Sequence, residues 1–287
     1  MGEGIETYLY RYPQLTLPVQ AGMSQDARYT DIVRRGKLPH ELPNPFYGHP
    51  ADRVFSIETP VGVRDVLYLA DRRDFVRFVQ VMAHRCEPVE IPDSMGAAAL
   101  LGVTNWRKIQ AHKRKWAVTG ATDWQAEFRR FTANKENYQD ELLVVSDGPY
   151  SAVPGEQLGL DEAQWRSDSL TVRIWHELTH LVCRKLWPEN KHAIRDEIVA
   201  DCIGLLAAFG RYDPTWALRI LGVREGAYLP GGRLQNYLTQ QLPDSQLLGA
   251  VERQVELLAQ QWQKTPQEPF AFLRTVEETK LGMENWL

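Results

Sequence analysis

The chain has 287 residues, of which 44% are hydrophobic and 24% are charged, and its formal net charge is −4. These values are typical of a soluble globular protein with one large or two modest domains, and they give no reason to expect nucleic acid or an anionic membrane as a partner. Its three cysteines do not form a disulfide framework, and the longest apolar run is too short to span a bilayer. Residues 1–12 lack the pattern of a signal peptide, so we expect a cytoplasmic protein.

The N-terminal half predicts short strands and helices after an irregular start. Prolines and aromatic residues are concentrated in residues 1–50, which indicates an arm with few regular elements. Apolar alternation and turn residues then predict a strand at 54–58, a turn at 59–62 and a strand at 63–69. Helical periodicity predicts a helix at 72–85 capped by Asp71 and a helical region at 93–115. A hairpin is expected over 142–153.

The C-terminal half is predicted to be helical. Asp161 is a suitable cap for a long helix that ends at Trp187-Pro188, and a second helix is expected to run from about 191 to Phe209 and to end at Gly210. The fold class is therefore α+β and helix-rich, with the strands in the N-terminal half. Two further helices are expected at 245–264 and 270–280. We expect the chain to divide into the arm at 1–50, a central domain at 51–230 and a C-terminal helical segment at 231–287, which can belong to the same domain.

The most informative motif is the pentapeptide His176-Glu177-Leu178-Thr179-His180. Two histidines four residues apart on a helix lie on one face, so both imidazoles can reach a single metal ion. The glutamate between them can hold and deprotonate a metal-bound water. This H-E-x-x-H motif resembles the signature of zincin metallopeptidases.

A third metal ligand is predicted on the next helix. If the chain turns back at Pro188, residues at equal distances from that turn lie at the same level on two antiparallel helices. By this symmetry Glu197 lies opposite His180 and Asp201 lies opposite His176, whereas His192 lies more than one turn away from His180. We therefore expect His176, His180 and Glu197 to bind Zn²⁺ and Asp201 to accept a hydrogen bond from the second ring nitrogen of His176.

H-E-x-x-H followed by E-x-x-x-D on the next helix resembles the gluzincins, the thermolysin-like class of zinc peptidases. The resemblance covers about 172–205, and 16 residues separate His180 from Glu197, slightly fewer than in thermolysin itself. Metzincins are excluded, because Leu186 stands where their third histidine would be. The resemblance implies that the central domain at 51–230 is a zincin-like catalytic domain, and that the protein is a peptidase with Glu177 as the general base.

Zincins usually contain a tyrosine or histidine that stabilises the negatively charged oxygen of the transition state. Tyr150 and Tyr212 are candidates for this role, and the sequence does not choose between them. The resemblance further suggests that the predicted hairpin at 142–153 supplies an edge strand for the substrate. The expected partner is a peptide or protein substrate, with no nucleic acid and no membrane, and the oligomeric state is not predicted.

Two other interpretations stay open. In the first, the protein is a non-catalytic zinc-binding regulatory or interaction protein, whose metal site is closed by a fourth ligand such as Cys183 or Asp201. In the second, the basic cluster at 106–116, which begins and ends with tryptophan, binds nucleic acid; a solvated helix face with its tryptophans turned inward is the simpler explanation. Signatures of serine hydrolases, P-loop proteins and dinucleotide-binding proteins are missing from the sequence.

Overall fold

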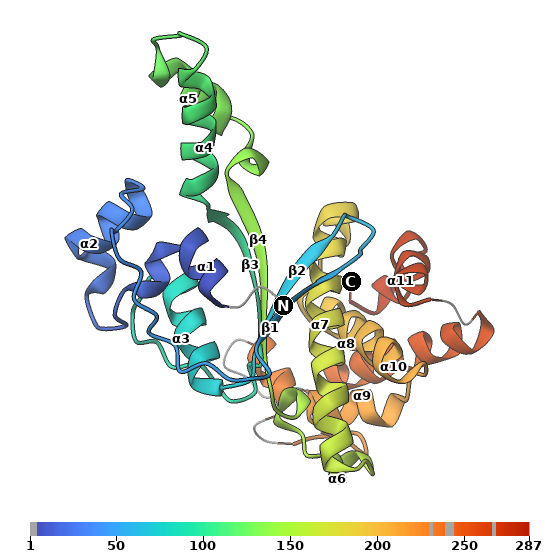
Figure 1. Cartoon of the computed structure of the whole chain (residues 1–287). Helices are drawn as coiled ribbons and strands as arrows, with labels where there is room; N and C mark the ends of the chain where they lie inside the picture. Colours follow the sequence, from blue (N-terminus) through green and yellow to red (C-terminus); the bar gives the residue numbers. More distant parts are fainter. Residues whose placement is uncertain (1–4, 230–231, 239–243, 266–267, 287) are drawn as a thin grey trace. The chain divides into compact units, whose positions relative to one another are not determined.

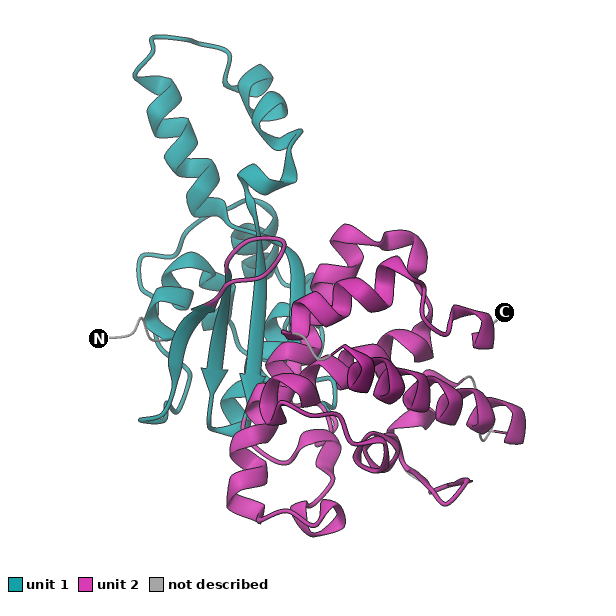
Figure 2. Ribbon diagram, turned by 90° about the vertical axis from the view of Figure 1, so that its right-hand side faces the viewer, with its two compact units in different colours: residues 1–56, 64–91, 98–146 teal, residues 57–63, 92–97, 147–287 magenta. Residues whose placement is uncertain are grey.

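A computed structural model describes residues 5–229, 232–238, 244–265 and 268–286. The chain is α+β and rich in helices, as predicted, with a small four-stranded sheet (Figure 1). It forms two compact units, which are shown in different colours in Figure 2. Unit 1 contains residues 1–56, 64–91 and 98–146, and unit 2 contains residues 57–63, 92–97 and 147–287.

The four-stranded sheet organises unit 1. Its strand order is β1-β2-β4-β3, and the central strands β2 and β4 are parallel, with Val66 opposite Leu143 and Leu69 opposite Ser146. Apolar side chains of both central strands are fully buried, so the core of this unit lies along them. The strands are β1 (Arg53–Ile57), β2 (Arg64–Leu69), β3 (Ala97–Thr104) and β4 (Gln139–Ser146).

The helices of unit 1 are short. The predicted helix after Asp71 is confirmed, because the Asp71 carboxylate accepts a hydrogen bond from the Arg73 amide and begins the helix. Residues 5–34 are less irregular than predicted for the segment at 1–50, while residues 35–52 contain no helix or strand. The helices are α1 (Ile5–Arg11), α2 (Ala27–Tyr29), α3 (Arg72–Met82), α4 (Trp106–Ala117) and α5 (Trp124–Thr132), with helical turns η1 (Pro13–Thr16), η2 (Met23–Gln25), η3 (Thr30–Arg34) and η4 (Lys135–Asn137).

The predicted helical region at 93–115 is only half correct. Residues 97–104 form the edge strand β3, and the helix begins at Trp106. The alanines and leucines of this segment favour a helix locally, but Gly102 has a φ of 76°, which an α-helix does not allow. Pairing with the neighbouring strand β4 therefore overrides the local preference.

The predicted hairpin over 142–153 is wrong. Its first half is strand β4, but Tyr150–Ala152 forms the 3-10 helix η5. Strand β4 already has β2 and β3 as neighbours, so neither of its sides is open to a further strand. The Tyr150 amide instead donates to the hydroxyl of Ser169 at 2.9 Å. The substrate edge that was expected from this hairpin is therefore absent.

Unit 2 is built on the pair of long helices that the sequence predicts. Asp161 caps α7 through the Gln164 amide, and α7 ends at Leu186. Helix α8 ends before Gly210, which has the left-handed conformation (φ 64°) that favours glycine. The helices of this unit are α6 (Gly155–Leu158), α7 (Glu162–Leu186), α8 (Ala193–Phe209), α9 (Pro214–Leu221), α10 (Ser245–Lys264) and α11 (Pro269–Glu278), with the turns η6 (Pro188–Asn190), η7 (Arg233–Tyr237) and η8 (Met283–Trp286) and the two short strands β5 (Val223–Arg224) and β6 (Ala227–Tyr228).

Buried polar contacts hold α11 against the start of α8. Arg195 is fully buried, and its guanidinium pairs with the Glu277 carboxylate at 2.9 Å. The Asn190 side-chain amide donates to the same carboxylate at 2.8 Å. Removing one partner of such a buried pair leaves an uncompensated charge, so these contacts fix the position of α8.

A glycine allows α7 and α8 to approach closely. A Cβ atom built on Gly204 of α8 would lie 2.7 Å from the backbone carbonyl oxygen of Val172 in α7. Real Cβ contacts are longer, so any larger residue at this position would push the two helices apart. The close approach matters because each helix carries part of the candidate site.

We expect Gly204→Ala to lower the free energy of unfolding by about 1–2 kcal/mol, because overpacking outweighs the gain of about 1 kcal/mol in helix propensity. Gly249→Ala in α10 is the matched control. There the added Cβ meets only the flexible end of Arg253, at 3.2 Å, so stability should rise. Urea unfolding of both variants measures the difference, and equal effects would show that the contact at Gly204 does not limit the helix spacing.

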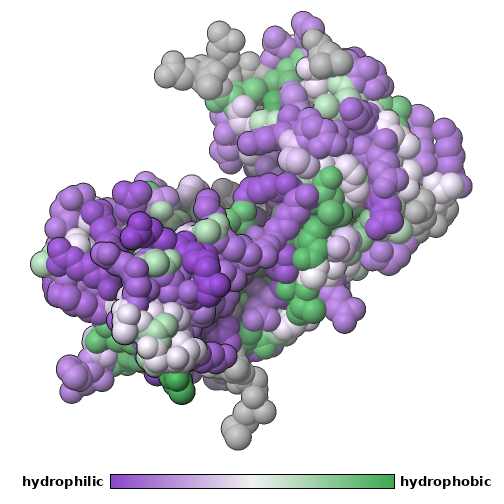
Figure 3. Space-filling view, turned by 90° about the horizontal axis from the view of Figure 1, so that it is seen from above, coloured by the Kyte–Doolittle hydropathy of each residue, from purple (hydrophilic) through white to green (hydrophobic). Residues whose placement is uncertain are grey.

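Among the described residues, no helix combines the length and apolar character that crossing a membrane requires. On the face shown in Figure 3, hydrophilic residues cover most of the surface and hydrophobic residues occur in small groups.

The unit boundary after residue 146 does not coincide with the predicted boundaries at 50/51 and 230/231. Of the segments predicted at 1–50 and 231–287, residues 1–4, 231, 239–243, 266–267 and 287 lie outside the described part of the chain.

Candidate metal centre

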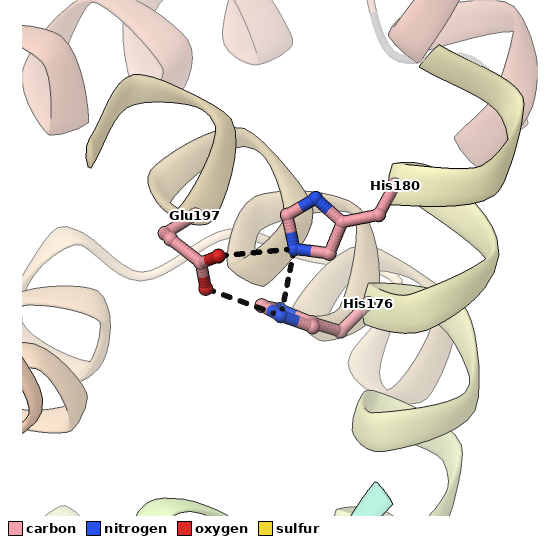
Figure 4. Close-up of side chains that lie close together, drawn as sticks. All are labelled: His176, His180 and Glu197. Carbon is pink, nitrogen blue, oxygen red and sulfur yellow. Dashed lines mark hydrogen bonds and ion pairs between the residues drawn. The ribbon is translucent and has the colours of Figure 1, made fainter. Parts of the chain in front are cut away.

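Two consecutive helices bring the predicted ligands together. Helix α7 presents His176 and His180 on one face, and α8 places Glu197 opposite them (Figure 4). Their nearest ligand atoms all lie within 4.8 Å of one another. The antiparallel return after Pro188 therefore produces the arrangement expected from the sequence.

The spacing of the ligand atoms suits a small tetrahedral ion. The Nε2 atoms of His176 and His180 are 3.1 Å apart. Of the Glu197 carboxylate oxygens, Oε2 lies 3.3 Å from Nε2 of His176, and Oε1 lies 3.3 Å from Nε2 of His180. With metal–ligand bonds of about 2.0–2.1 Å, neighbouring ligands of a tetrahedral zinc ion are about 3.3–3.4 Å apart. Two imidazoles and one carboxylate thus fit the donor set and dimensions of a three-residue zinc site.

A buried network orients His176. Its Nδ1–H donates to Asp201 at 2.9 Å, which leaves the lone pair of Nε2 facing Glu197 and His180. The Tyr150 hydroxyl donates to the same Asp201 oxygen at 2.6 Å, and the Arg233 guanidinium donates to the other. Asp201 is almost fully buried, so these contacts satisfy a charge that would otherwise be costly.

Mutual hydrogen bonds and charges shift the pKa values of the buried groups at the site. Burial opposes the protonation of His176, but hydrogen bonds to Asp201 and Glu197 outweigh it and raise the pKa of His176 to about 9. Burial would also raise the pKa of Glu197, yet hydrogen bonds with His176 and His180 hold it well below its usual range. Burial acts in the same way on Asp201, whose pKa is nevertheless lowered by the charge of Arg233. Ionised carboxylates attract positive charge. The attraction that favours a proton on the neighbouring histidine would act on a divalent cation in the same place.

Glu177 lies beside the ligands, on the wall of a cavity of about 290 Å³ that also contacts His176 and Tyr237. Within the described part of the chain, Glu177 forms no hydrogen bond or ion pair with another side chain. A carboxylate in this position can contact a water or substrate atom next to the ligand cluster. A second cavity, of about 350 Å³, is lined by His180, Glu197 and Tyr237.

Neither tyrosine considered from the sequence has a hydroxyl that faces the ligand cluster freely. The Tyr150 hydroxyl is held by Asp201 and accepts a hydrogen bond from Arg233 at 2.7 Å. Tyr212 is buried, and neither of the two cavities includes it among its lining residues. Tyr237, which the sequence did not suggest, lines both cavities and donates to Glu197 at 2.7 Å.

The other predicted alternatives lie elsewhere. His192 caps α8 by accepting from the Arg195 amide, and its ring contacts that of Trp286 at a tilt, with centroids 4.8 Å apart, so it does not join the ligand cluster. Cys183 lines the larger cavity but is not in the group of potential metal ligands found among the described residues. Burial raises the pKa of its thiol, which keeps it protonated and unlike a metal-binding thiolate.

The network around Asp201 leads to a prediction. Asp201→Asn keeps the size of the side chain but removes the charge that orients His176, so zinc affinity should fall by about 10–100-fold. Competition with a chromophoric chelator measures the change. Asp244→Asn, at the exposed cap of α10, is the control, since asparagine caps helices equally well. If both variants bind zinc as tightly as the original protein does, the proposed role of Asp201 is wrong.

Comparisons with known proteins add a family but no activity. No curated protein and no solved structure matches the chain. One family model matches residues 3–281, nearly the whole chain, and its description is "Family of unknown function (DUF7005)". The match includes both helices of the ligand cluster, so the cluster lies within the region that the family model describes. The chain therefore belongs to the DUF7005 family.

Proposed function

We propose that this protein is a zinc-dependent metallohydrolase, a gluzincin-like peptidase that hydrolyses peptide bonds with a metal-activated water. The observation that carries the proposal is the cluster of His176, His180 and Glu197, with Glu177 on the wall of the adjoining cavity. The proposed cofactor is Zn²⁺, because the donor set and the separations of 3.1–3.3 Å suit its tetrahedral geometry.

When bound by these three residues, zinc would polarise the scissile carbonyl group and acidify the attacking water. Glu177 would act as general base, accepting a proton from the attacking water as the water oxygen adds to the carbonyl carbon. The carbon–nitrogen bond then breaks, and Glu177 passes the proton to the leaving nitrogen. Tyr237 lines both cavities and is the candidate to donate to the carbonyl oxygen as negative charge develops on it, by leaving its hydrogen bond to Glu197. The Tyr150 hydroxyl is less suited to this role because Asp201 and Arg233 both hold it.

The alternative is a non-catalytic zinc protein with a closed site. Such a site needs a fourth protein ligand, and the candidates were Cys183 and Asp201. Both carboxylate oxygens of Asp201 accept hydrogen bonds, from His176, Tyr150 and Arg233, and Cys183 is outside the ligand cluster among the described residues. These contacts favour an open site.

The test is to incubate the purified protein with a peptide library derived from a proteome and to identify new termini by mass spectrometry. The proposal expects cleavage that a zinc chelator abolishes and that added zinc restores. Lack of cleavage by the zinc-loaded protein, for peptides and for folded proteins alike, would leave the closed-site alternative in its place. All three cysteines are free, which fits the reducing cytoplasm that we propose as the location.

A further inference from the structure

A helical hairpin in unit 1 has a local excess of positive charge. This basic arm, residues 105–138, connects the neighbouring strands β3 and β4 and contains α4 and α5 (Figure 1). It contains eight lysines and arginines but three acidic residues, a formal charge of +5 in a chain whose net charge is −4. The net charge of the whole chain gave no reason to expect a nucleic-acid partner. It averages over this local excess of positive charge, so it does not reveal it.

The arm has its own small aromatic core. His112 of α4 stacks on Phe131, with ring centroids 4.0 Å apart, and Trp116 contacts Trp124 of α5 at 5.4 Å. At its base, the Trp106 indole donates to the Val33 carbonyl oxygen at 2.8 Å. The two helices therefore present a defined surface rather than a loose loop.

The last turn of α4 is an exposed cationic stripe. Lys113, Arg114 and Lys115 are all exposed, and no carboxylate among the described residues forms an ion pair with them. Two other cations of the arm do form ion pairs, Lys108 with Asp140 at 2.5 Å and Arg130 with Glu127 at 2.7 Å. Exposed cations without a carboxylate partner are available to a polyanion.

Aromatic surface adjoins these cations. The Lys113 ammonium lies 5.3 Å from the centre of the Trp124 ring, and Trp116 and Trp124 are each half-buried. Part of each indole is thus available for contact within reach of the cationic stripe. Proteins that bind single-stranded nucleic acid combine these two features. Their cations bind the phosphates, and neighbouring aromatic rings stack on the bases.

We propose that the basic arm binds single-stranded nucleic acid through the phosphates at Lys113, Arg114 and Lys115 and through base stacking at Trp116 and Trp124. Insertion into a membrane is less well supported, because Val118 is the one large hydrophobic side chain of the arm that is strongly exposed among the described residues. An acidic protein segment would use the charges but would not need the tryptophans. This proposal does not depend on hydrolase activity.

The experiment measures the fluorescence anisotropy of a labelled oligothymidylate of about 12 nucleotides, a length within the usual site size of such modules. Replacing Lys113, Arg114 and Lys115 together with glutamine should abolish most binding and reduce the slope of log affinity against log salt by about 2, or about 0.7 for each phosphate contact. The control triple variant, Arg253→Gln with Lys264→Gln and Lys280→Gln, makes the same charge change at exposed positions outside the arm and should change neither value.

A second measurement separates stacking from charge alone. Trp124→Ala should weaken oligonucleotide binding by about 5–100-fold, and binding should quench tryptophan fluorescence in the original protein. Unchanged affinity in the lysine–arginine variant or equal losses in the control triple would overturn the proposal. So would equal affinity for polyglutamate of the same charge, or a preference for phosphatidylserine vesicles over the oligonucleotide.

Discussion

Glu177→Gln is expected to retain bound zinc and to lose about 10²–10⁴-fold in kcat, the range that a general base contributes. The amide is nearly the same size as the carboxylate but cannot accept the proton of the attacking water. Glu177 belongs to none of the ligand contacts, so the metal should remain. Hydrolysis of a peptide identified by the library experiment gives kcat, and elemental analysis of the same sample gives the zinc content.

Glu189→Gln is the matched control for this variant. Glu189 is an exposed residue of the turn between the two site helices, so the same chemical change is made outside the ligand cluster. Its activity should equal that of the original protein. If Glu177→Gln retained full activity, or if it lost zinc, Glu177 would not be the general base.

The second large effect is expected at the third ligand. Glu197→Ala leaves only two histidines to hold the metal. Losing a residue that merely orients a ligand costs up to about 100-fold in metal affinity, so losing a ligand itself should lower zinc affinity by more than about 100-fold. Equilibrium dialysis with zinc, followed by elemental analysis, measures this loss. The near-UV circular dichroism spectrum checks that the variant keeps its tertiary structure.

His192→Ala is the comparison for the third ligand. His192 is the other downstream side chain that a sequence-based search for ligands considers, and the structure places it at the cap of α8 against Trp286. This variant should lose some stability but bind zinc normally. The opposite pattern, with zinc lost in His192→Ala and kept in Glu197→Ala, would require a different ligand set.

The site helices were predictable because their signals are local. Asp161 and Gly210 mark a helix start and a helix end, and the turn at Pro188 fixes how the second helix returns along the first. Equal distances from that turn were sufficient to place Glu197 near His180 and Asp201 near His176. Regular helices of known rise convert sequence separation into position, so little tertiary information was needed.

The strands and the turn after β4 were less predictable, because distant parts of the chain determine them. The segment at 97–104 is rich in alanine and leucine, and its strand pairing with β4 comes from residues about 40 positions later in the sequence. Tyr150 leaves the sheet because Ser169, 19 residues further on, accepts its amide. Nothing in the local pattern distinguishes these outcomes from a helix and a hairpin.

Two side chains near the ligands could not have been found by motif or periodicity. Arg233 and Tyr237 lie on a short 3-10 helix and reach Asp201 and Glu197 across 32 and 40 residues of sequence. Both are single residues in an irregular segment, where sequence separation does not give position. Their roles depend on the tertiary structure that carries η7 to α8.

The most direct test of the proposed metal centre is the metal content of the full-length protein, purified without added zinc and without chelator. The proposal predicts about one zinc ion per chain, the number held by one three-residue site, and the loss of that ion when His176 and His180 are both replaced by alanine. Protein that contains no divalent metal and does not bind zinc on titration would contradict the proposal. Zinc that is retained after both histidines are replaced would contradict it equally.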